Sequence, residues 1–312
     1  MVTSFTDGVR LIRFIGATRT DLDGALWEPE GGRSRAAILH LHGKGGNFYS
    51  STGRFIPELT RREPVTHLAI NMTCHDLGYT REDRYAQCRP QDAERVAGGM
   101  WERLADGRAD VAAATELLRS LGHELIFLAG HSSGGFYATD YAAHDLDIAG
   151  RVLLSPLTSN RSAFPRWFPE AEEREAAVEQ ARELVTAGRG HDLIPLRSWY
   201  FAVSANSLLE RASEPSDHFE RALDSNRTPL LMLWGSGEDR HDLWSSVYDR
   251  CAAPDKQRVV LPTPDHYYRG HEQPIADAVV GFVLSRANDG GHVVKGEEDR
   301  TKMPATPTGG AM

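Results

Sequence analysis

Short apolar runs alternate with longer helical segments along this 312-residue chain, and the alternation constrains the fold more than any other feature. Several runs are nearly continuous in Val, Ile and Leu, which is typical of strands covered on both faces. The strands are predicted at residues 9–17, 36–43, 66–73, 125–130, 151–156, 229–235 and 258–262, with 24–29 as a further edge strand. The helices are predicted near residues 51–63, 101–121, 134–145, 242–253 and 272–286. This order predicts an α/β fold with a mostly parallel central sheet flanked by helices.

Two segments depart from the alternation. Residues 157–228 separate two predicted strands by a distance far longer than a usual connection, which predicts an inserted helical cap. The core would then comprise residues 1–156 and 229–286. Residues 287–312 are polar and rich in Gly, Pro and Thr, so we expect a disordered tail.

Composition narrows the possible partners and location. The formal charge is −9, from 35 basic and 44 acidic residues, which argues against nucleic acid or an anionic membrane surface as the main partner. No apolar stretch is long enough to span a bilayer, and charged residues interrupt the first sixteen positions where a leader would need an apolar run. Three scattered cysteines favour neither a disulfide framework nor a zinc ribbon. We therefore expect a cytoplasmic protein of unknown oligomeric state.

The stretch LIFLAGHSSGGFYA, which begins at residue 125, suggests where chemistry could occur. Gly130-His131-Ser132-Ser133-Gly134 fits G-x-S-x-G, with a strand before it and a helix after it. A nucleophilic serine on such a turn needs small residues two positions before and after it, because the turn is strained and tightly packed. Ser133 fits less well, because His131 would then occupy the position that must be small. Ser132 is the predicted nucleophile.

A serine hydroxyl needs a base to accept its proton, and a histidine base needs a carboxylate to orient it. His266 follows the last predicted strand and precedes the final helix, so it would lie at the carboxyl edge of the sheet, where ligands bind in open parallel sheets. Glu238 and Asp239 follow the strand at 229–235 at the same edge. We prefer Asp239 as the acid and keep Glu238 as the alternative, with Asp242 assigned to capping the next helix.

Attack by a serine creates an oxyanion, which needs backbone N–H donors that already point toward it. The amide of Ser133 is one predicted donor, because it follows the nucleophile at the start of a helix. The other is predicted in HLHGKGGNFYS, where three glycines allow an amide to turn inward, and we assign it to Lys44. We expect the Lys44 side chain to face solvent.

These motifs together resemble the α/β-hydrolase superfamily across roughly residues 9–286. The resemblance rests on LHLHGKGGNFY, MTCHDLGYTRED, LAGHSSGGFYA, LLMLWGSGEDR and PDHYYRGHE, and on the chain order Ser132, Asp239, His266. Within the superfamily the chain is most similar to the siderophore-esterase and carboxylesterase-like branch. It departs from that branch in having Cys74 before His-Asp-Leu-Gly and Ser133 after the nucleophile.

The predicted function is a serine hydrolase that cleaves a carboxylic ester or lactone of a small molecule through an acyl-enzyme on Ser132. A thioesterase, amidase or acyltransferase would use the same three residues, and a non-catalytic ligand-binding protein of this fold is a further alternative. No cofactor is expected. His40 and His42 lack an evident third ligand, so no metal is expected either. Aromatic residues in the cap suggest either the cap's own core or an apolar substrate pocket: Trp167, Phe168, Trp199 and Tyr200.

Overall fold

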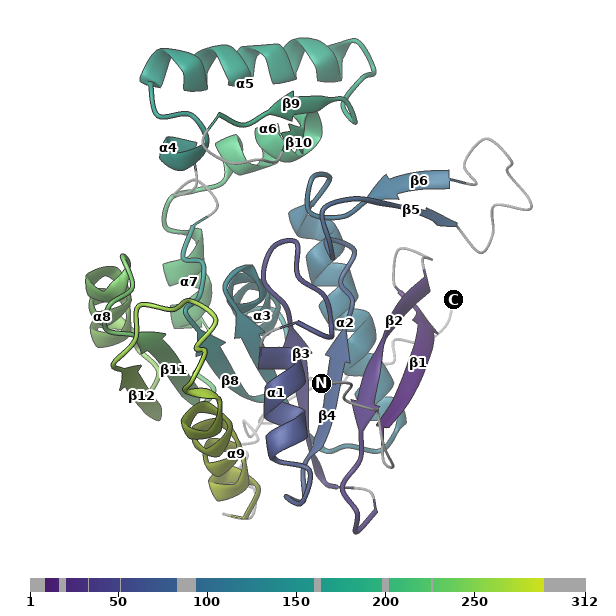
Figure 1. The fold of residues 1–312 in the computed structure, drawn as a ribbon, viewed down its shortest axis with the longest axis vertical. Coiled ribbons are helices and arrows are strands. Elements are labelled where there is room, and N and C mark those ends of the chain that lie inside the picture. The colour runs from purple at the N-terminus through teal and green to yellow at the C-terminus, as the bar shows by residue number, and fades with distance from the viewer. Residues whose placement is uncertain are drawn as a thin grey trace, which may run out of the picture.

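The computed structural model describes residues 9–16, 21–32, 34–50, 52–82, 94–159, 164–197, 202–225 and 227–288. Eight strands of the described residues form one sheet (Figure 1). Across the sheet they follow the order β1 (Val9–Ile15), β2 (Asp21–Trp27), β4 (Thr66–Ile70), β3 (Ala36–Leu41), β7 (Leu125–His131), β8 (Ile148–Leu154), β11 (Leu230–Gly235) and β12 (Lys256–Leu261). The pairs from β4 to β12 are parallel, whereas β1–β2 and β2–β4 are antiparallel. The predicted α/β architecture is confirmed.

The position of β2 corrects one prediction. The run near 24–29 was expected to form an edge strand, but β2 lies between β1 and β4, and β1 forms the edge. Trp27 of β2 and Ala25 are buried, whereas Leu11 of β1 is 72% exposed. The edge is therefore the strand that carries Arg10 and Arg13 and has no buried residue, which suits a strand with one unpaired side.

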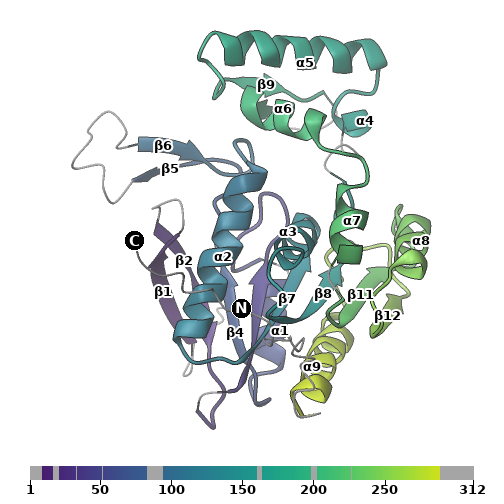
Figure 2. The same ribbon diagram turned by 180° about the vertical axis from the view of Figure 1, so that it is seen from behind.

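Helices cover both faces of the sheet. On one face lie α1 (Thr52–Leu59) and α9 (Glu272–Asn288). On the opposite face, turned toward the viewer in Figure 2, are α2 (Leu104–Ser120), α3 (Ser133–Ala142), α7 (His218–Ser225) and α8 (His241–Arg250). Two separate apolar cores result, with Phe136 and Trp234 in one and Phe127 and Val279 in the other. Burial on both faces explains why the central strands are almost continuously apolar.

The residues between β8 and β11 form most of a second layer above the sheet in Figure 1. Its elements are α4 (Phe164–Trp167), α5 (Ala171–Thr186), β9 (Leu193–Pro195), β10 (Ala202–Ser204) and α6 (Ala205–Ser213), which share a hydrophobic core of their own. We call residues 164–213 the cap. The final helix of the predicted insertion, α7, instead packs on α3, and its Phe219 joins the hydrophobic core on the sheet face covered by α2 and α3. The insertion 157–228 thus begins as a cap and ends within the main body.

A short hairpin also extends at the cap side, formed by β5 (Tyr79–Glu82) and β6 (Glu94–Ala97), neither of which was predicted. The helix α9 ends at Asn288, so residues 287 and 288 of the predicted disordered tail are helical, and the rest of that tail, 289–312, lies outside the described residues. None of the helices in the described ranges is both long and apolar enough to cross a membrane.

Candidate active site

Ser132 stands at the turn where β7 ends and α3 begins. Its φ of 55° and ψ of −118° lie in a region that residues with a Cβ rarely adopt. The turn is fixed by backbone hydrogen bonds in which Ser132 N–H donates to the Leu154 carbonyl at 2.9 Å and Leu157 N–H donates to the Ser132 carbonyl at 2.8 Å. Such a strained turn holds the side chain of its apical residue outside the sheet.

The glycines on either side of Ser132 explain why the turn can close. A Cβ on Gly130 would lie 2.2 Å from the carbonyl oxygen of Gly134, and a Cβ on Gly134 would lie 2.2 Å from the carbonyl oxygen of Leu41. Neither contact is possible for a real methyl group. The requirement for small residues two positions before and after Ser132 therefore follows from the packing of β7, α3 and β3 against one another.

His266 lies in the loop between β12 and α9, close to the residue that precedes Ser132. The rings of His131 and His266 have centroids 4.6 Å apart, and His131 Nε2 is 2.8 Å from the His266 carbonyl oxygen. A carbonyl can only accept, so Nε2 of His131 carries the proton. Burial lowers the pKa of His131 to about 3, and this side chain therefore stays neutral while it holds the 266 loop against β7.

The acid that contacts His266 is Glu238, and the preference for Asp239 was wrong on this point. Glu238 Oε2 is 2.8 Å from His266 Nδ1, and the Glu238 side chain is 4% exposed. Asp239 lies at the exposed surface of the same turn. The turn after β11 brings Glu238 N–H to the Gly235 carbonyl at 3.2 Å, which directs the Glu238 side chain inward and its neighbour outward.

The second oxygen of Glu238 is held by groups that the sequence did not reveal. Oε1 accepts hydrogen bonds from Ser155 Oγ at 2.6 Å and from the Gly235 amide at 2.9 Å. Ser155 Oγ also meets the hydroxyl of Tyr268 at 2.5 Å, and that tyrosine is fully buried. Ser155 and Tyr268 both have positive φ, of 41° and 61°. The carboxylate is thus fixed on both oxygens, with one of them on the imidazole.

The loop after β3 passes directly over Ser132. A Cβ on Gly43 would lie 3.1 Å from the Ser132 Cβ, so the glycine allows this close approach. The loop is closed by Gly46 N–H donating to the Gly43 carbonyl at 2.9 Å, and Gly45 has a φ of +66°. We call residues 43–46 the oxyanion loop. Lys44 lies in this loop, and Ser133 is the first residue of α3. That their amides donate to an oxyanion stays a prediction.

The Lys44 side chain was expected to face solvent, but it is turned inward. It is 13% exposed, and its Nζ donates to the Gly99 carbonyl and to Glu102 Oε2, each at 2.7 Å. Burial lowers the pKa of Lys44, and the charge of Glu102 opposes that shift. Burial would raise the pKa of Glu102, but Arg211 and Lys44 outweigh it and lower that pKa to about 2. A buried acid of the opposite charge accounts for the inward position of Lys44.

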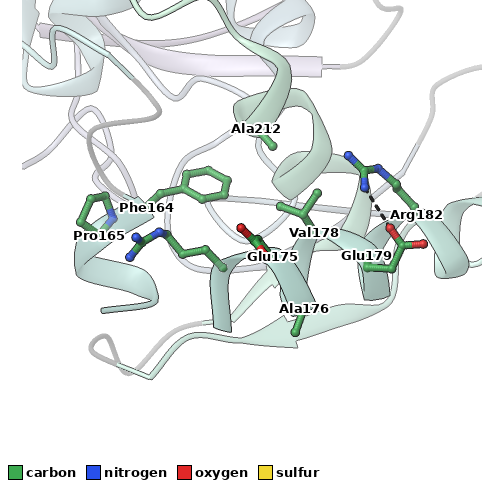
Figure 3. Close-up of a pocket in the computed structure, with 9 residues that line it drawn as sticks. Phe164, Pro165, Glu175, Ala176, Val178, Glu179, Arg182 and Ala212 are labelled. Atoms are coloured by element: carbon green, nitrogen blue, oxygen red, sulfur yellow. Dashed lines mark hydrogen bonds and ion pairs between the residues drawn. The ribbon is translucent and has the colours of Figure 1, made fainter. Parts of the chain in front are cut away.

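The aromatic residues of the cap divide between described and undescribed positions. Trp167 and Phe168 are 1% and 4% exposed and belong to the cap's hydrophobic core, which was one of the two expected roles. Trp199 and Tyr200 lie outside the described residues. A hollow of about 760 Å³ opens within the cap between α4, α5 and α6 (Figure 3). It is lined by Phe164, Val178 and Ala212 with charged residues of α5, and none of the site residues described above borders it.

His40 and His42, the two histidines weighed for a metal, make other contacts. His40 Nε2 is 3.0 Å from His67 Nδ1, and His42 accepts a hydrogen bond from the Met72 amide at 3.1 Å. Burial lowers the pKa of His42 to about 4 and that of His67 to about 3. Within the described ranges, no three His, Cys, Asp or Glu side chains are grouped so that they could hold a metal ion.

Comparison with known proteins identifies the family. Residues 38–280 match the alpha/beta hydrolase family, and the chain belongs to this family. No match was found among curated proteins. The narrower resemblance to siderophore esterases stays a prediction.

Solved structures share the fold at low sequence identity. Est1E from Butyrivibrio proteoclasticus is 17% identical with a TM-score of 0.65, over 88% of this chain and 98% of that chain. The hypothetical protein PA2218 from Pseudomonas aeruginosa is 16% identical with a TM-score of 0.68, over 91% and 96%. The Pyrococcus furiosus esterase Pf2001 is 16% identical with a TM-score of 0.58, over 91% and 95%.

Proposed function

We propose that this protein is a serine hydrolase that cleaves a carboxylic ester or lactone of a small molecule. The observation that carries the proposal is the hydrogen-bonded chain from Ser155 through Glu238 to the imidazole of His266. The loop that carries His266 is bonded to His131, the residue directly before the strained Ser132. Membership of the alpha/beta hydrolase family supports the same reaction. Esterases are among the proteins of similar fold, and one Est1E structure is described with ferulic acid bound.

In the proposed reaction, the Nδ1–H of His266 donates to Glu238, which leaves Nε2 to accept a proton. Ser132 Oγ attacks the carbonyl carbon while its proton passes to His266. The carbonyl oxygen becomes an oxyanion that receives hydrogen bonds from the amides of Ser133 and Lys44. Collapse breaks the ester C–O bond, and the departing alkoxide takes the proton from His266. Water, activated by the same imidazole, then attacks the acyl-enzyme and restores Ser132.

Glu238 is suited to orient the His266 imidazole because its carboxylate is held in place. Its carboxylate is buried and meets donors at both oxygens, so its orientation is fixed before a substrate binds. His266 is 38% exposed on its side chain and can therefore meet a substrate. A carboxylate held in this way keeps the imidazole in one tautomer and stabilises the imidazolium that forms during the reaction.

The direct test is hydrolysis of p-nitrophenyl esters of graded chain length, with lactones and thioesters in parallel. We expect turnover of at least one ester or lactone, and Ser132→Ala should lower kcat by about 10⁴ or more. Ser285→Ala is the matched control, because that hydroxyl donates to the Phe282 carbonyl on α9. Ester turnover that persists in folded Ser132→Ala protein would contradict the proposal.

A further inference from the structure

A buried group of charges joins the oxyanion loop to the cap. Glu102, with 2% of its side chain exposed, contacts Lys44 at 2.7 Å, forms an ion pair with Arg211 and accepts a hydrogen bond from the Tyr137 hydroxyl at 2.7 Å. Trp167 covers the two cations, with its ring centre 5.8 Å from Lys44 Nζ and 5.2 Å from the Arg211 guanidinium carbon. We call these five residues the junction cluster.

Each member of the junction cluster comes from a different part of the fold. Lys44 belongs to the oxyanion loop and Glu102 precedes α2, whereas Tyr137 is on α3. Arg211 and Trp167 come from the cap helices α6 and α4. Glu102 is therefore the common partner of the main body, the loop over Ser132 and the cap.

The segment that carries Glu102 is itself bonded to the cap. Trp101 Nε1 donates to the His191 carbonyl at 2.9 Å, and Ser204 N–H donates to the Met100 carbonyl at 2.8 Å. A movement of the cap relative to the sheet would have to break these bonds or displace residues 99–102. Because Lys44 Nζ is bonded to both Gly99 and Glu102, such a displacement would reach the oxyanion loop.

The contacts of the junction cations leave little surface for a substrate. The side chains of Lys44 and Arg211 are 13% and 6% exposed, and both are turned toward Glu102. A direct ionic contact with substrate would require these side chains to leave Glu102, at the cost of a buried unpaired carboxylate. Their arrangement fits a role in holding backbone better than a role in binding ligand.

We propose that the junction cluster positions the oxyanion loop, and that it makes the oxyanion-stabilising geometry dependent on the docked cap. Lys44 is a positioning residue through its side chain, because the bonds to Gly99 and Glu102 fix the residue whose amide faces the oxyanion. Arg211 acts one step further away, through Glu102. This inference rests on the proposed function for its kinetic consequences and on the loop contacts alone for its structural one.

The test compares Lys44→Met, Lys44→Arg and Arg211→Met with two controls. Lys44→Met keeps the apolar stem and the backbone amide but removes the charge. Lys256→Met is the matched lysine control, since Lys256 Nζ bonds the Tyr248 and Cys251 carbonyls far along the chain from the cluster. Arg108→Met is the matched arginine control, because Arg108 forms a two-bond pair with buried Asp140 between α2 and α3.

Two kinetic readouts separate positioning from general damage. We expect Lys44→Met to lower kcat by about 10² with less than about threefold change in KM, as for a displaced oxyanion donor. Binding of a boronic acid, which forms a tetrahedral anion on Ser132, should weaken by a similar factor, whereas binding of the alcohol product should not change. Lys44→Arg should restore most of kcat, and Arg211→Met should lower kcat about tenfold.

Amide hydrogen exchange without substrate tests the structural half independently of any ester. We expect amides of residues 43–46 to exchange about tenfold faster or more in Lys44→Met and Arg211→Met than in the wild type, and at the wild-type rate in both controls. Unchanged exchange in folded Lys44→Met overturns the inference whatever the enzyme hydrolyses. Equal weakening of the boronic acid and the alcohol also overturns it. If the wild type hydrolyses no ester or lactone in a way that depends on Ser132, the proposed function alone is refuted.

Discussion

Glu238 and Glu102 are both buried, and their partners differ. Glu238 meets one imidazole, one hydroxyl and one backbone amide. Glu102 meets two full cations and a tyrosine hydroxyl. A carboxylate between two cations is committed to its ion pairs, whereas one that faces a histidine can respond when that ring takes a proton. The difference in partners separates a group suited to a reaction cycle from one suited to holding segments together.

The largest expected effect tests the reactive half of this comparison. Glu238→Gln should lower kcat on the order of 10⁴, because an amide in place of the carboxylate favours the wrong imidazole tautomer. Asp239→Asn, one position along the same turn, should change kcat by less than about threefold. Steady-state kinetics on the best ester measures both. The reverse ranking would return the acid role to Asp239.

The structural half predicts a different response to the same substitution. Glu102→Gln leaves Lys44 and Arg211 buried without their counter-ion, and breaking a buried pair in this way costs about 3–5 kcal/mol of unfolding free energy. In Glu238→Gln the amide oxygen can still accept from Ser155 and Gly235, so we expect a loss within about 1 kcal/mol. Urea unfolding at pH 7.5 measures both. Equal losses would erase the distinction between the two sites.

Proton linkage separates the two regions further. The folded pKa of His131 is lowered to about 3, below the 6.5 of an unfolded chain, so its contribution to stability is complete above pH 6.5 and is lost as pH falls toward 3. His131→Gln should therefore remove about one proton of uptake on unfolding, or about 1.4 kcal/mol per pH unit, near pH 5.5. Because the Glu102 pKa is lowered to about 2 from 4.5, its contribution is lost only as pH falls from about 4.5 toward 2.

Urea titrations between pH 6.5 and 5.5 measure this linkage. The wild type should lose stability across this range with a steeper slope than His131→Gln. Glu102→Gln should keep the wild-type slope, because Glu102 is ionised in both states there. A wild-type slope in the His131→Gln protein would show that this histidine is not held neutral in the fold.

The smallest expected effect concerns the support of Glu238. Ser155→Ala removes one hydrogen bond to Oε1 while the Gly235 amide remains, and a bond to a charged group is worth about 1.5–3 kcal/mol. We expect kcat to fall about tenfold with little change in KM. Tyr268→Phe should have a smaller effect, because its hydroxyl reaches Glu238 only through Ser155. A larger loss in Tyr268→Phe than in Ser155→Ala would contradict this order, because the substitution keeps the ring and the tyrosine hydroxyl would then act other than through Ser155.

The sequence predicted the sheet because continuous apolar runs leave few alternatives for covered strands, and β7 and β11 lie within a residue of their expected bounds. Ser132 and His266 could be proposed from the sequence for a related reason, since glycines and strand ends mark places where side chains can leave the sheet. Adjacent acids on one turn could not be separated, because periodicity does not show which of Glu238 and Asp239 points inward.

Other features depended on tertiary contacts that leave no local pattern. Glu102 lies at the start of the helix predicted near 101–121, but helical periodicity does not show its cationic partners, which lie 58 and 109 positions away along the chain. The inward position of Lys44 follows from its pairing with Glu102. Because that pairing is long-range, the local sequence of the Gly-rich loop did not predict an inward lysine. Ser155 closes an apolar strand and gains its role only when β11 lies alongside.

The central claim is that Ser132 carries the acyl group in a reaction driven by His266 and Glu238. The most direct measurement is mass spectrometry of protein quenched during turnover of its best ester. The claim predicts an acyl adduct on the peptide that contains Ser132, and the adduct should accumulate if His266→Ala slows its hydrolysis more than its formation. It also predicts stoichiometric fluorophosphonate labelling of Ser132 in the wild type. An adduct on another residue, or an enzyme that turns over ester while Ser132 resists both reagents, would contradict it.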